Sequence, residues 1–323
     1  MNTNATRRTL LGACLWLVPL LSAGQLAVPV QAQSANNGWA LVDCDKEPHG
    51  ALQRAIDRAR AGDGIQVRGT CEEHVVLTAG KDLLTLEGGG SGTISGPDTT
   101  LNVLQVRGPV GVTIRGLRIT GGRAGIDISR GSSAVIDGNV IEFTGRNGIT
   151  LGAFATANIV NNVIRNNAAA GILLTGNAFG FIGFRTADDP VASPNTIRAN
   201  GTHGISVTLS SSARIAGNVI SDNVRNGISV DRVSQANISD NDIDANGQSG
   251  IFVTENSGVD LGTDTGNGLF DAPNRTTLNN VLRGITCRMG GYANGRTGTL
   301  NGAAGVKDVG SSCVDTLNVP DTF

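Results

Sequence analysis

The chain has few aromatic residues, few lysines and no long apolar run in its body. Phe, Trp and Tyr make up 3% of its 323 residues, and the three lysines are Lys46, Lys81 and Lys307. Its 25 basic residues are outnumbered by 27 acidic ones, so the chain lacks the basic surface that phosphate binding needs, and we expect no nucleic-acid partner. A membrane-spanning helix needs roughly 20 apolar residues, and we expect no membrane span.

The first 32 residues have the pattern of an export signal. Arg7 and Arg8 precede an apolar stretch of about 14 residues, and Ala32 ends a small-x-Ala cleavage site. The paired arginines fit the Sec route and the twin-arginine route. Taking these two arginines from 25 basic residues leaves 23 against 27 acidic ones, a net charge of −4. We expect an exported, periplasmic or extracellular protein.

Four cysteines remain after the signal, one pair near each end of the chain. Three disulfide pairings are open, and we favour Cys44 with Cys71 and Cys287 with Cys313, because the members of each pair lie in the same terminal region. A metal site is the rival interpretation. It is weaker because the chain has no CxxC spacing and its three histidines lie far apart in sequence.

An internal repeat of 23 residues runs through the middle of the chain. A Gly-Ile pair marks each unit, with spacings of 23, 23, 33, 23 and 23, beginning at Gly125, Gly148, Gly171, Gly204, Gly227 and Gly250. A second marker is an Asn two residues before an apolar residue, in the pattern Asn-x-Ile, found at Asn139, Asn162, Asn195, Asn218 and Asn241. The two series place a ten-residue insertion within residues 183–194.

Each unit contains three short β-branched runs separated by Gly, Ser, Asn and Asp, which predicts strands and turns and excludes a helical solenoid. One unit cannot bury its own apolar face, so successive units must stack. The stack would bring the isoleucines that follow each Gly into one inward column, with Ile149 and Ile172 as neighbours. The asparagines would form a hydrogen-bonded ladder at a turn.

These residues resemble the right-handed parallel β-helix superfamily that includes pectate lyases, polygalacturonases and NosD-like periplasmic proteins. We expect an all-β, single-stranded solenoid over residues 65–283, preceded by a cap at 33–64 and followed by a Gly-rich cap at 284–323. Leu52, Ala55, Ile56 and Ala59 have helical spacing, which predicts a capping helix within residues 50–61, as is common in the superfamily.

A candidate binding face lies beside the insertion. Arg165 and Arg198 would occupy adjacent coils, and two stacked guanidinium groups suit a polymer of uronic acids. The insertion adds Phe181, Phe184 and Arg185 as candidate substrate-binding residues, because loops on a rigid scaffold often carry function.

Asp188 and Asp189, followed by His203 before Gly204, are candidate catalytic residues. This order is similar to the Asp-Asp and Gly-His-Gly elements of polygalacturonases. The rest of that pattern is missing, which places inverting hydrolysis in doubt. His203 also occupies the repeat position of Asn147 and Asn226, where a structural role is the simpler explanation.

Two further sets of residues carry weaker hypotheses. Phe252 and Leu173 fall on an outward column with Asp127 and are candidate sugar platforms. We expect no cofactor. Ca²⁺ would suit Asp240, Asp242 and Asp244, or the stretch 260–271, but solvated acidic turns explain both.

Two functions follow as hypotheses. The first is a protein that binds or processes an acidic polysaccharide, and it rests on fold analogy. The second is a non-catalytic periplasmic or cell-surface scaffold or adhesion protein. In either case we expect a monomer. A groove that gathers six polar side chains would favour the first hypothesis: Arg165, Arg185, Asp188, Asp189, Arg198 and His203.

Overall fold

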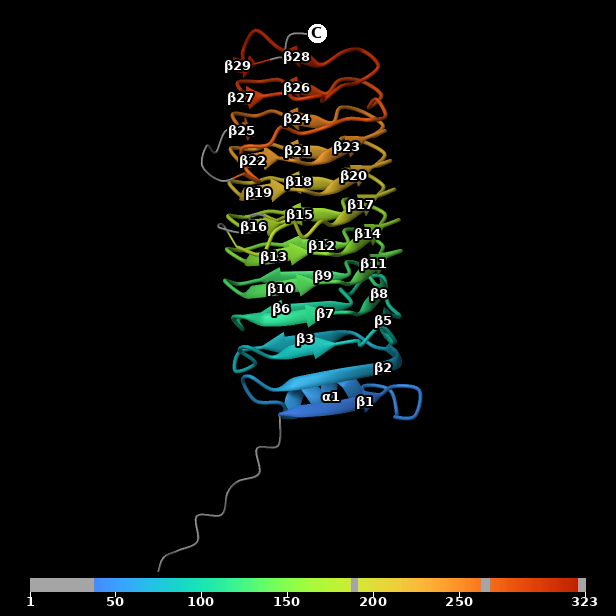
Figure 1. Ribbon diagram of the computed structural model, residues 1–323. Helices are drawn as coiled ribbons and strands as arrows, with labels where there is room; N and C mark the ends of the chain where they lie inside the picture. The colour runs from blue at the N-terminus through green and yellow to red at the C-terminus, as the bar shows by residue number, and fades with distance from the viewer. Residues whose placement is uncertain (1–37, 187–190, 263–267, 319–323) are drawn as a thin grey trace, which may run out of the picture. The chain divides into compact units, whose positions relative to one another are not determined.

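The chain folds as a parallel β-solenoid of about 12 turns (Figure 1). The computed structural model describes residues 38–186, 191–262 and 268–318. Each regular coil gives one short strand to each of three parallel sheets, which we call sheets A, B and C. Residues 23 apart therefore become neighbours, and Ile149 pairs with Ile172 as predicted. The all-β solenoid expected from the repeat is confirmed.

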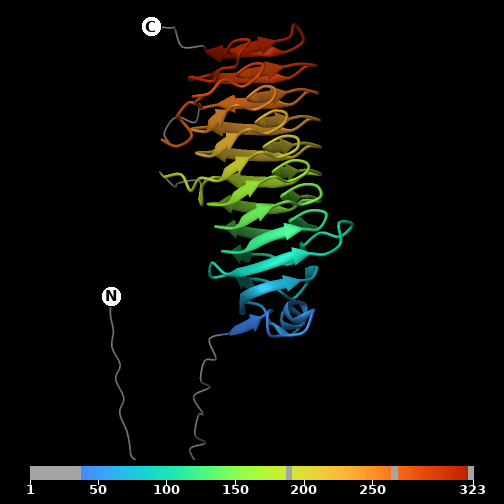
Figure 2. The same cartoon turned by 90° about the vertical axis from the view of Figure 1, so that its right-hand side faces the viewer.

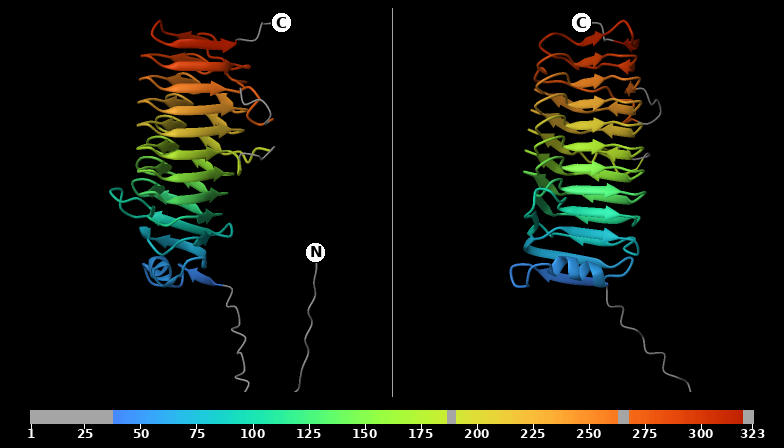
Figure 3. Two further views of the ribbon diagram at one scale, coloured as in Figure 1. Left: turned by 90° about the vertical axis from the view of Figure 1, so that its left-hand side faces the viewer. Right: turned by 180° about the vertical axis from the view of Figure 1, so that it is seen from behind.

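The strands follow one another in the order A, B, C along most coils, and Figures 2 and 3 show them in successive layers. Sheet A contains β1 (Trp39–Asp43), β2 (Gly64–Glu72), β4 (Thr85–Glu87), β7 (Val112–Arg115), β10 (Ser133–Asp137), β13 (Thr156–Val160), β16 (Phe179–Ile182), β19 (Ser212–Ala216), β22 (Gln235–Ser239), β25 (Gly258–Leu261), β27 (Tyr292–Arg296) and β29 (Val314–Asn318). Sheet B contains the second half of β2 with β5 (Gly92–Gly96), β8 (Arg118–Gly121), β11 (Val140–Glu142), β14 (Val163–Arg165), β17 (Thr196–Arg198), β20 (Val219–Ser221) and β23 (Asp242–Asp244). Sheet C contains β3 (Val75–Thr78), β6 (Leu104–Arg107), β9 (Ile126–Ser129), β12 (Ile149–Leu151), β15 (Ile172–Leu174), β18 (Ile205–Val207), β21 (Ile228–Val230), β24 (Ile251–Val253), β26 (Ile285–Cys287) and β28 (Lys307–Val309).

The interior is aliphatic because the inward positions of all three sheets carry branched apolar residues. Burial of each such side chain stabilises the fold by roughly 1.5–3 kcal/mol. The isoleucine column predicted for sheet C is confirmed, since its members are fully buried and pair coil to coil: Ile126, Ile149, Ile172, Ile205, Ile228 and Ile251.

Asparagine side chains close the corner between sheets A and B. The Nδ2 of Asn195 donates to Oδ1 of Asn218 at 2.8 Å and to the carbonyl of Ile159 at 2.7 Å. Its Oδ1 accepts from the backbone N–H of Asn162 at 3.0 Å. The predicted ladder from Asn139 to Asn241 is confirmed, and Asn274 extends it. Each buried amide is satisfied by the coils on either side.

A second ladder closes the corner between sheets B and C, and the sequence prediction missed it. The Nδ2 of Asn200 donates to Oδ1 of Asn223 at 3.0 Å. Its signature is an Asn four residues before a Gly-Ile pair, as Asn200 stands before Gly204. The members are Asn167, Asn200, Asn223, Asn246 and Asn280, with Thr144 at the N-terminal end.

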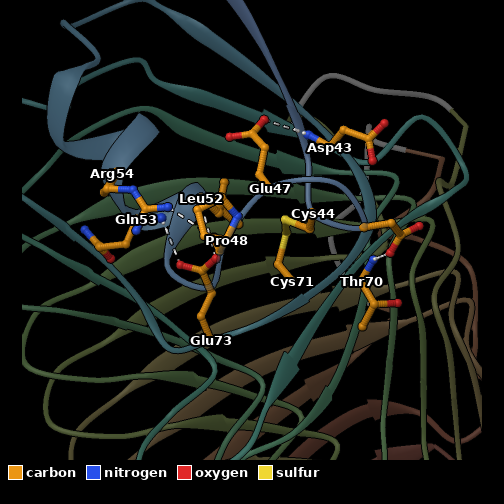
Figure 4. Close-up of a disulfide and its surroundings, with 11 residues drawn as sticks. Asp43, Cys44, Glu47, Pro48, Leu52, Gln53, Arg54, Thr70, Cys71 and Glu73 are labelled. Atoms are coloured by element: carbon orange, nitrogen blue, oxygen red, sulfur yellow. Dashed lines mark hydrogen bonds between the residues drawn. A yellow bond between two sulfur atoms is a disulfide. The ribbon is translucent and has the colours of Figure 1, made fainter.

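Helix α1 (Ala51–Arg58) covers the N-terminal end of the core beside β1 and β2, so the predicted capping helix is confirmed (Figure 3). It buries Leu52 and Ile56 completely. The Glu73 carboxylate accepts hydrogen bonds from the backbone N–H groups of Leu52 at 3.1 Å and Gln53 at 2.9 Å (Figure 4). A negative charge at this position is favourable because it meets the positive end of the helix dipole. Among the described residues, no helix is long and apolar enough to cross a membrane.

The coils continue past residue 283, which corrects the predicted boundary. Sheet C runs on through β26 and β28, and sheet A runs on through β27 and β29. The repeat pattern fades there because regular sheet B strands stop at β23, while Cys287 and Lys307 take the sheet C positions that Val253 and Ile285 hold one coil earlier. The Gly-rich tail is therefore part of the solenoid up to residue 318.

Two insertions leave the corner between sheets A and B and pack against each other. The first, residues 183–194, was predicted and follows β16, and the second, residues 262–273, was not predicted and follows β25. The rings of Phe184 and Phe270 meet at a centroid distance of 4.8 Å, edge to face. Arg214 lies 3.9 Å above the centre of the Phe270 ring. The insertions therefore form a small second hydrophobic core outside the solenoid.

Candidate functional site

Arg165 and Arg198 pair in register on neighbouring coils of sheet B, as the spacing predicted. Arg165 is held by Glu142 of the preceding coil, with 2.7 Å between Nε and Oε2. Glu142 is fully buried, and Arg118 faces its other oxygen at 2.5 Å in an ion pair without a hydrogen bond. Arg198 is exposed and has no ion-pair partner among the residues that the structure describes. The expected pair of free guanidinium groups is therefore reduced to one.

The insertion residues are engaged in packing and pairing. Phe184 is fully buried against Phe270, so it cannot offer its ring to a ligand, which corrects its expected role. Phe181 is half-buried and meets Phe184 edge to face at 5.4 Å. Arg185 forms an ion pair with Asp137 at 2.9 Å. The predicted catalytic residues Asp188 and Asp189 lie outside the described residues.

His203 precedes β18 and lies on the sheet C side of the coil. Its Nδ1 is 3.4 Å from Nδ2 of Asn226 on the next coil. Burial, together with the nearby positive charge of Arg225, lowers the pKa of His203 from 6.5 to about 4, although Asp231 acts in the opposite direction. The imidazole is therefore neutral at pH 7 and can donate or accept a hydrogen bond without carrying charge.

The sequence-predicted site residues do not converge. Arg165 and Arg198 lie on sheet B, Arg185 lies by the end of β10 in sheet A, and His203 lies by sheet C. The period correctly placed residues of one column above each other. It carried no information on which columns share a concave surface.

A cleft of about 210 Å³ lies on the outer face of sheet C, and we call it the sheet C cleft. Asp127, Thr150 and Leu173 form its floor, since they point outward from β9, β12 and β15 and pair in register. Two arginines from the corner between sheets B and C rise beside it, Arg123 and Arg146, and both are exposed. Leu173, a predicted sugar platform, thus lies inside a polar cleft.

The carboxyl group that lines the sheet C cleft, that of Asp127, has a shifted pKa. Burial raises the pKa of Asp127 above its ordinary value, although a hydrogen bond from Ser129 and the charges of Arg107 and Arg123 oppose the shift. Arg123 and Arg146 have no ion-pair partners within the described part of the chain. The cleft therefore presents two available guanidinium groups beside a carboxyl group that resists ionisation.

The sequence prediction missed these arginines, although a signal for them exists. Arg123, Arg146 and Arg225 each stand two residues before a Gly-Ile pair, in the pattern Arg-x-Gly-Ile. Arg225 is also exposed and lies along the same corner. The pattern repeats a positive charge at one edge of sheet C, on a chain whose net charge is negative.

The acidic residues proposed for Ca²⁺ are occupied by other partners. Arg275 forms ion pairs with Asp240 and with Asp242, the latter at 2.7 Å. Asp244 accepts hydrogen bonds from the backbone N–H groups of Thr277 at 2.7 Å and of Leu278 at 3.1 Å. These carboxylates fasten the coil after the second insertion and leave no open oxygen cage.

Within the described residues, the four cysteine sulfurs and the imidazoles of His74 and His203 are likewise engaged by partners, while His49 is exposed at the surface. Cys44 is bonded to Cys71 (Figure 4), and Cys287 is bonded to Cys313, so both predicted disulfides are present. The two ring nitrogens of His74 contact the carbonyl of Asn102 at 3.0 Å and the backbone N–H of Asp98 at 3.2 Å. The single cluster of three metal-type donors found there consists of the first disulfide and Glu73, whose sulfurs are already bonded to each other.

The class of protein is a parallel β-helix, and a family model identifies the chain more closely. The model of the family described as "Periplasmic copper-binding protein (NosD)" matches residues 54–262, well over half of the chain. The chain belongs to this family. No curated protein sequence is significantly similar to it.

Solved structures share the fold at low sequence identity. An alginate lyase from Paenibacillus sp. is 17% identical, with a TM-score of 0.53. The match covers 86% of this chain and 99% of the lyase. The catalytic unit of an α-1,3-glucanase from Streptomyces thermodiastaticus is 14% identical, over 84% of this chain and 67% of its own, with a TM-score of 0.50. A periplasmic alginate epimerase is 17% identical with a TM-score of 0.49, and the match covers 80% of this chain but 58% of the epimerase.

Proposed function

We propose that this protein binds an acidic polysaccharide along the outer face of sheet C, with the sheet C cleft as the main contact. The observation that carries the proposal is the pair of exposed arginines without ion-pair partners, Arg123 and Arg146, above a half-buried floor. A guanidinium group binds a carboxylate through two parallel hydrogen bonds, so repeated uronate carboxylates suit a row of arginines.

The choice of sheet C over sheet B follows from what each arginine contacts. On sheet B, Arg165 already neutralises Glu142, so Arg198 is the one guanidinium group of that pair without an ion-pair partner among the described residues. On sheet C, the charges border a cleft that also offers an amide, a hydroxyl and an apolar side chain, from Asn147, Thr150 and Leu173. Ligand sites are usually concave and combine apolar walls with a few polar groups.

The comparisons support a polymer ligand in a general way. Two solved proteins with this fold are an alginate lyase and an α-1,3-glucanase, and both are named for polysaccharides. Because their sequence identity is low, they support a shared fold and nothing more. We therefore infer the acidic character of the ligand from the arginines of this chain. An export signal at 1–32, outside the described residues, and two disulfides favour a periplasmic location, as in the family description.

The test is binding of the mature protein to alginate, pectate and neutral glucan, measured by calorimetry at low and moderate salt. We expect the double variant Arg123→Ala/Arg146→Ala to lose affinity for the acidic polymers by about 10- to 100-fold per arginine. The matched control is Arg198→Ala, another exposed arginine, which should change affinity by less than about threefold. Loss of binding in the control, with binding intact in the double variant, would move the site to sheet B and refute the proposal.

A second candidate function, proton transfer at the bound sugar, is favoured by the raised pKa of Asp127. In β-elimination, this carboxylate would take the proton at C5 of a uronate while the C4–O bond breaks and a C4=C5 double bond forms. Water would supply the proton to the leaving oxygen. Unsaturated products should then absorb in the ultraviolet, and Asp127→Asn should abolish the absorbance without abolishing binding. Binding without any product would leave the non-catalytic function.

Copper, which the family description names, does not fit the donors that the structure describes. Copper sites are built from imidazole, thiolate and thioether ligands. Here the four cysteines are oxidised in pairs, His74 and His203 have partners of their own, and His49 belongs to no cluster of three donors within the described residues. We therefore assign copper no role in the proposed function.

A further inference from the structure

A second cleft opens on the same face of sheet C, near the C-terminal end of the stack, and we call it the C-terminal cleft. Its volume is about 500 Å³. It is formed by the coils on either side of the second insertion, where the sequence repeat begins to fade. Phe252 and Thr286 form its floor, because they point outward from β24 and β26 and pair in register.

The walls of the C-terminal cleft combine an aromatic ring with one available positive charge. Arg288 is held by Asp308, with 3.1 Å between Nη1 and Oδ1, so its charge is compensated. Arg283 is half-buried at the cleft and has no ion-pair partner among the described residues. Gln248 adds an amide to the same wall. A ring, a guanidinium group and an amide suit a sugar with an apolar face, a carboxylate and hydroxyl groups.

The two clefts are aligned along the solenoid axis. Arg146 precedes β12 and Arg283 precedes β26, which lies five coils further along sheet C. At about 4.8 Å per coil, the two guanidinium groups are separated by about 24 Å. An extended uronate chain advances by a similar step per sugar residue, so a short oligomer cannot reach both clefts and a longer one can.

The surface between the clefts is low and polar. Its outward positions on β18 and β21 are Ser206 and Ser229, which pair in register and leave no large side chain in the path. His203 borders this stretch and is uncharged at pH 7 because burial lowers its pKa to about 4. Along these strands a polymer would cross from one cleft to the other over small polar side chains, with Arg225 at the corner beside it.

We propose that the sheet C cleft and the C-terminal cleft are two subsites for one polymer, which lies along the solenoid axis. This inference rests on the proposed function and adds that the ligand must be long. Two linked contacts raise the affinity because the second is made at high effective concentration. The protein should thus distinguish a polymer from its short fragments.

The test is a length series of oligouronates, from disaccharide to octasaccharide, titrated calorimetrically into the mature protein. For the unmodified protein, we expect the affinity to rise by about 100-fold once the oligomer spans both clefts. Phe252→Ala and Arg283→Gln should each reduce that gain by at least about tenfold while leaving disaccharide affinity unchanged. Phe143→Ala is the matched control, because Phe143 is 57% exposed beside sheet B.

The outcomes separate the two proposals. If affinity does not depend on length, or if neither variant reduces the long-chain gain, the second subsite is refuted while the proposed function stands. If no oligomer or polymer of any length binds, the proposed function fails and takes this inference with it. Arg283→Gln removes the charge of a half-buried side chain and keeps a polar group there, so it reports on the subsite even if Phe252→Ala unfolds the C-terminal coils.

Discussion

Replacing Asn195 by alanine should destabilise the solenoid by about 3–5 kcal/mol. Asn195 is fully buried in the corner between sheets A and B. Its amide joins three successive coils, since it donates to Asn218 and Ile159 and accepts from the backbone N–H and the side chain of Asn162. Alanine would remove all of these hydrogen bonds at once.

The magnitude follows from one group left without a partner and three hydrogen bonds lost. The backbone N–H of Asn162 would be unsatisfied in a buried corner, which costs about 1–3 kcal/mol, whereas the carbonyl of Ile159 loses one hydrogen bond but keeps the one from Gly183. The neighbouring amides of Asn162 and Asn218 each lose one hydrogen bond as well. A water molecule entering the space would recover part of the cost, which sets the upper limit near 5 kcal/mol rather than at the sum.

The assay is urea denaturation, combined with hydrogen exchange in the coils around β14 and β17, because a solenoid can unfold in segments. The control is Asn158→Ala, whose side chain makes one hydrogen bond at the surface, to the carbonyl of Arg185 at 2.6 Å. We expect the control to cost less than about 1 kcal/mol. If the two variants lose equal stability, or if exchange at the Asn195 corner is unchanged, the ladder does not have the stabilising role argued here.

Four further predictions follow from single contacts. The pKa of His203 is about 4 in the folded chain and 6.5 ordinarily, so the unfolded chain binds more protons between these two pH values. The stability of the fold should therefore decrease as the pH is lowered from 6.5 to 4. In melting curves recorded over this pH range, His203→Asn should remove that part of the decrease. Phe184→Ala should cost about 3 kcal/mol locally, seen as faster proteolysis within the two insertions while the solenoid keeps its melting temperature; unchanged cleavage would show that the second hydrophobic core does not hold them. Reduction of the Cys44–Cys71 bond, which closes a separation of 27 residues, should cost about 3–4 kcal/mol, and a melting temperature insensitive to reductant would contradict this. Dialysis against copper followed by desalting should leave no stoichiometric metal, and retained copper at one equivalent per chain would overturn the assignment of donors.

The sequence alone determined the architecture of this protein, because in a solenoid one period fixes every vertical neighbour. The spacing of 23 placed Ile149 on Ile172 and Asn195 between its ladder partners, and residues in the same terminal region proved to be the disulfide partners. The period does not indicate which residues of different columns contact each other. The same pattern contained the second ladder, whose signature lies in the residues before each Gly-Ile pair.

Only the tertiary structure decided which charges are available and which surfaces are concave. Arg165 is compensated by Glu142, one repeat earlier in the same column, and Phe184 is buried by Phe270 from an insertion three coils away, a contact that no repeat spacing contains. The arginine row of sheet C became a candidate site because the corner between sheets B and C raises Arg123 and Arg146 beside a cleft. Side-chain direction at a corner depends on the local backbone geometry, which the coil period does not predict.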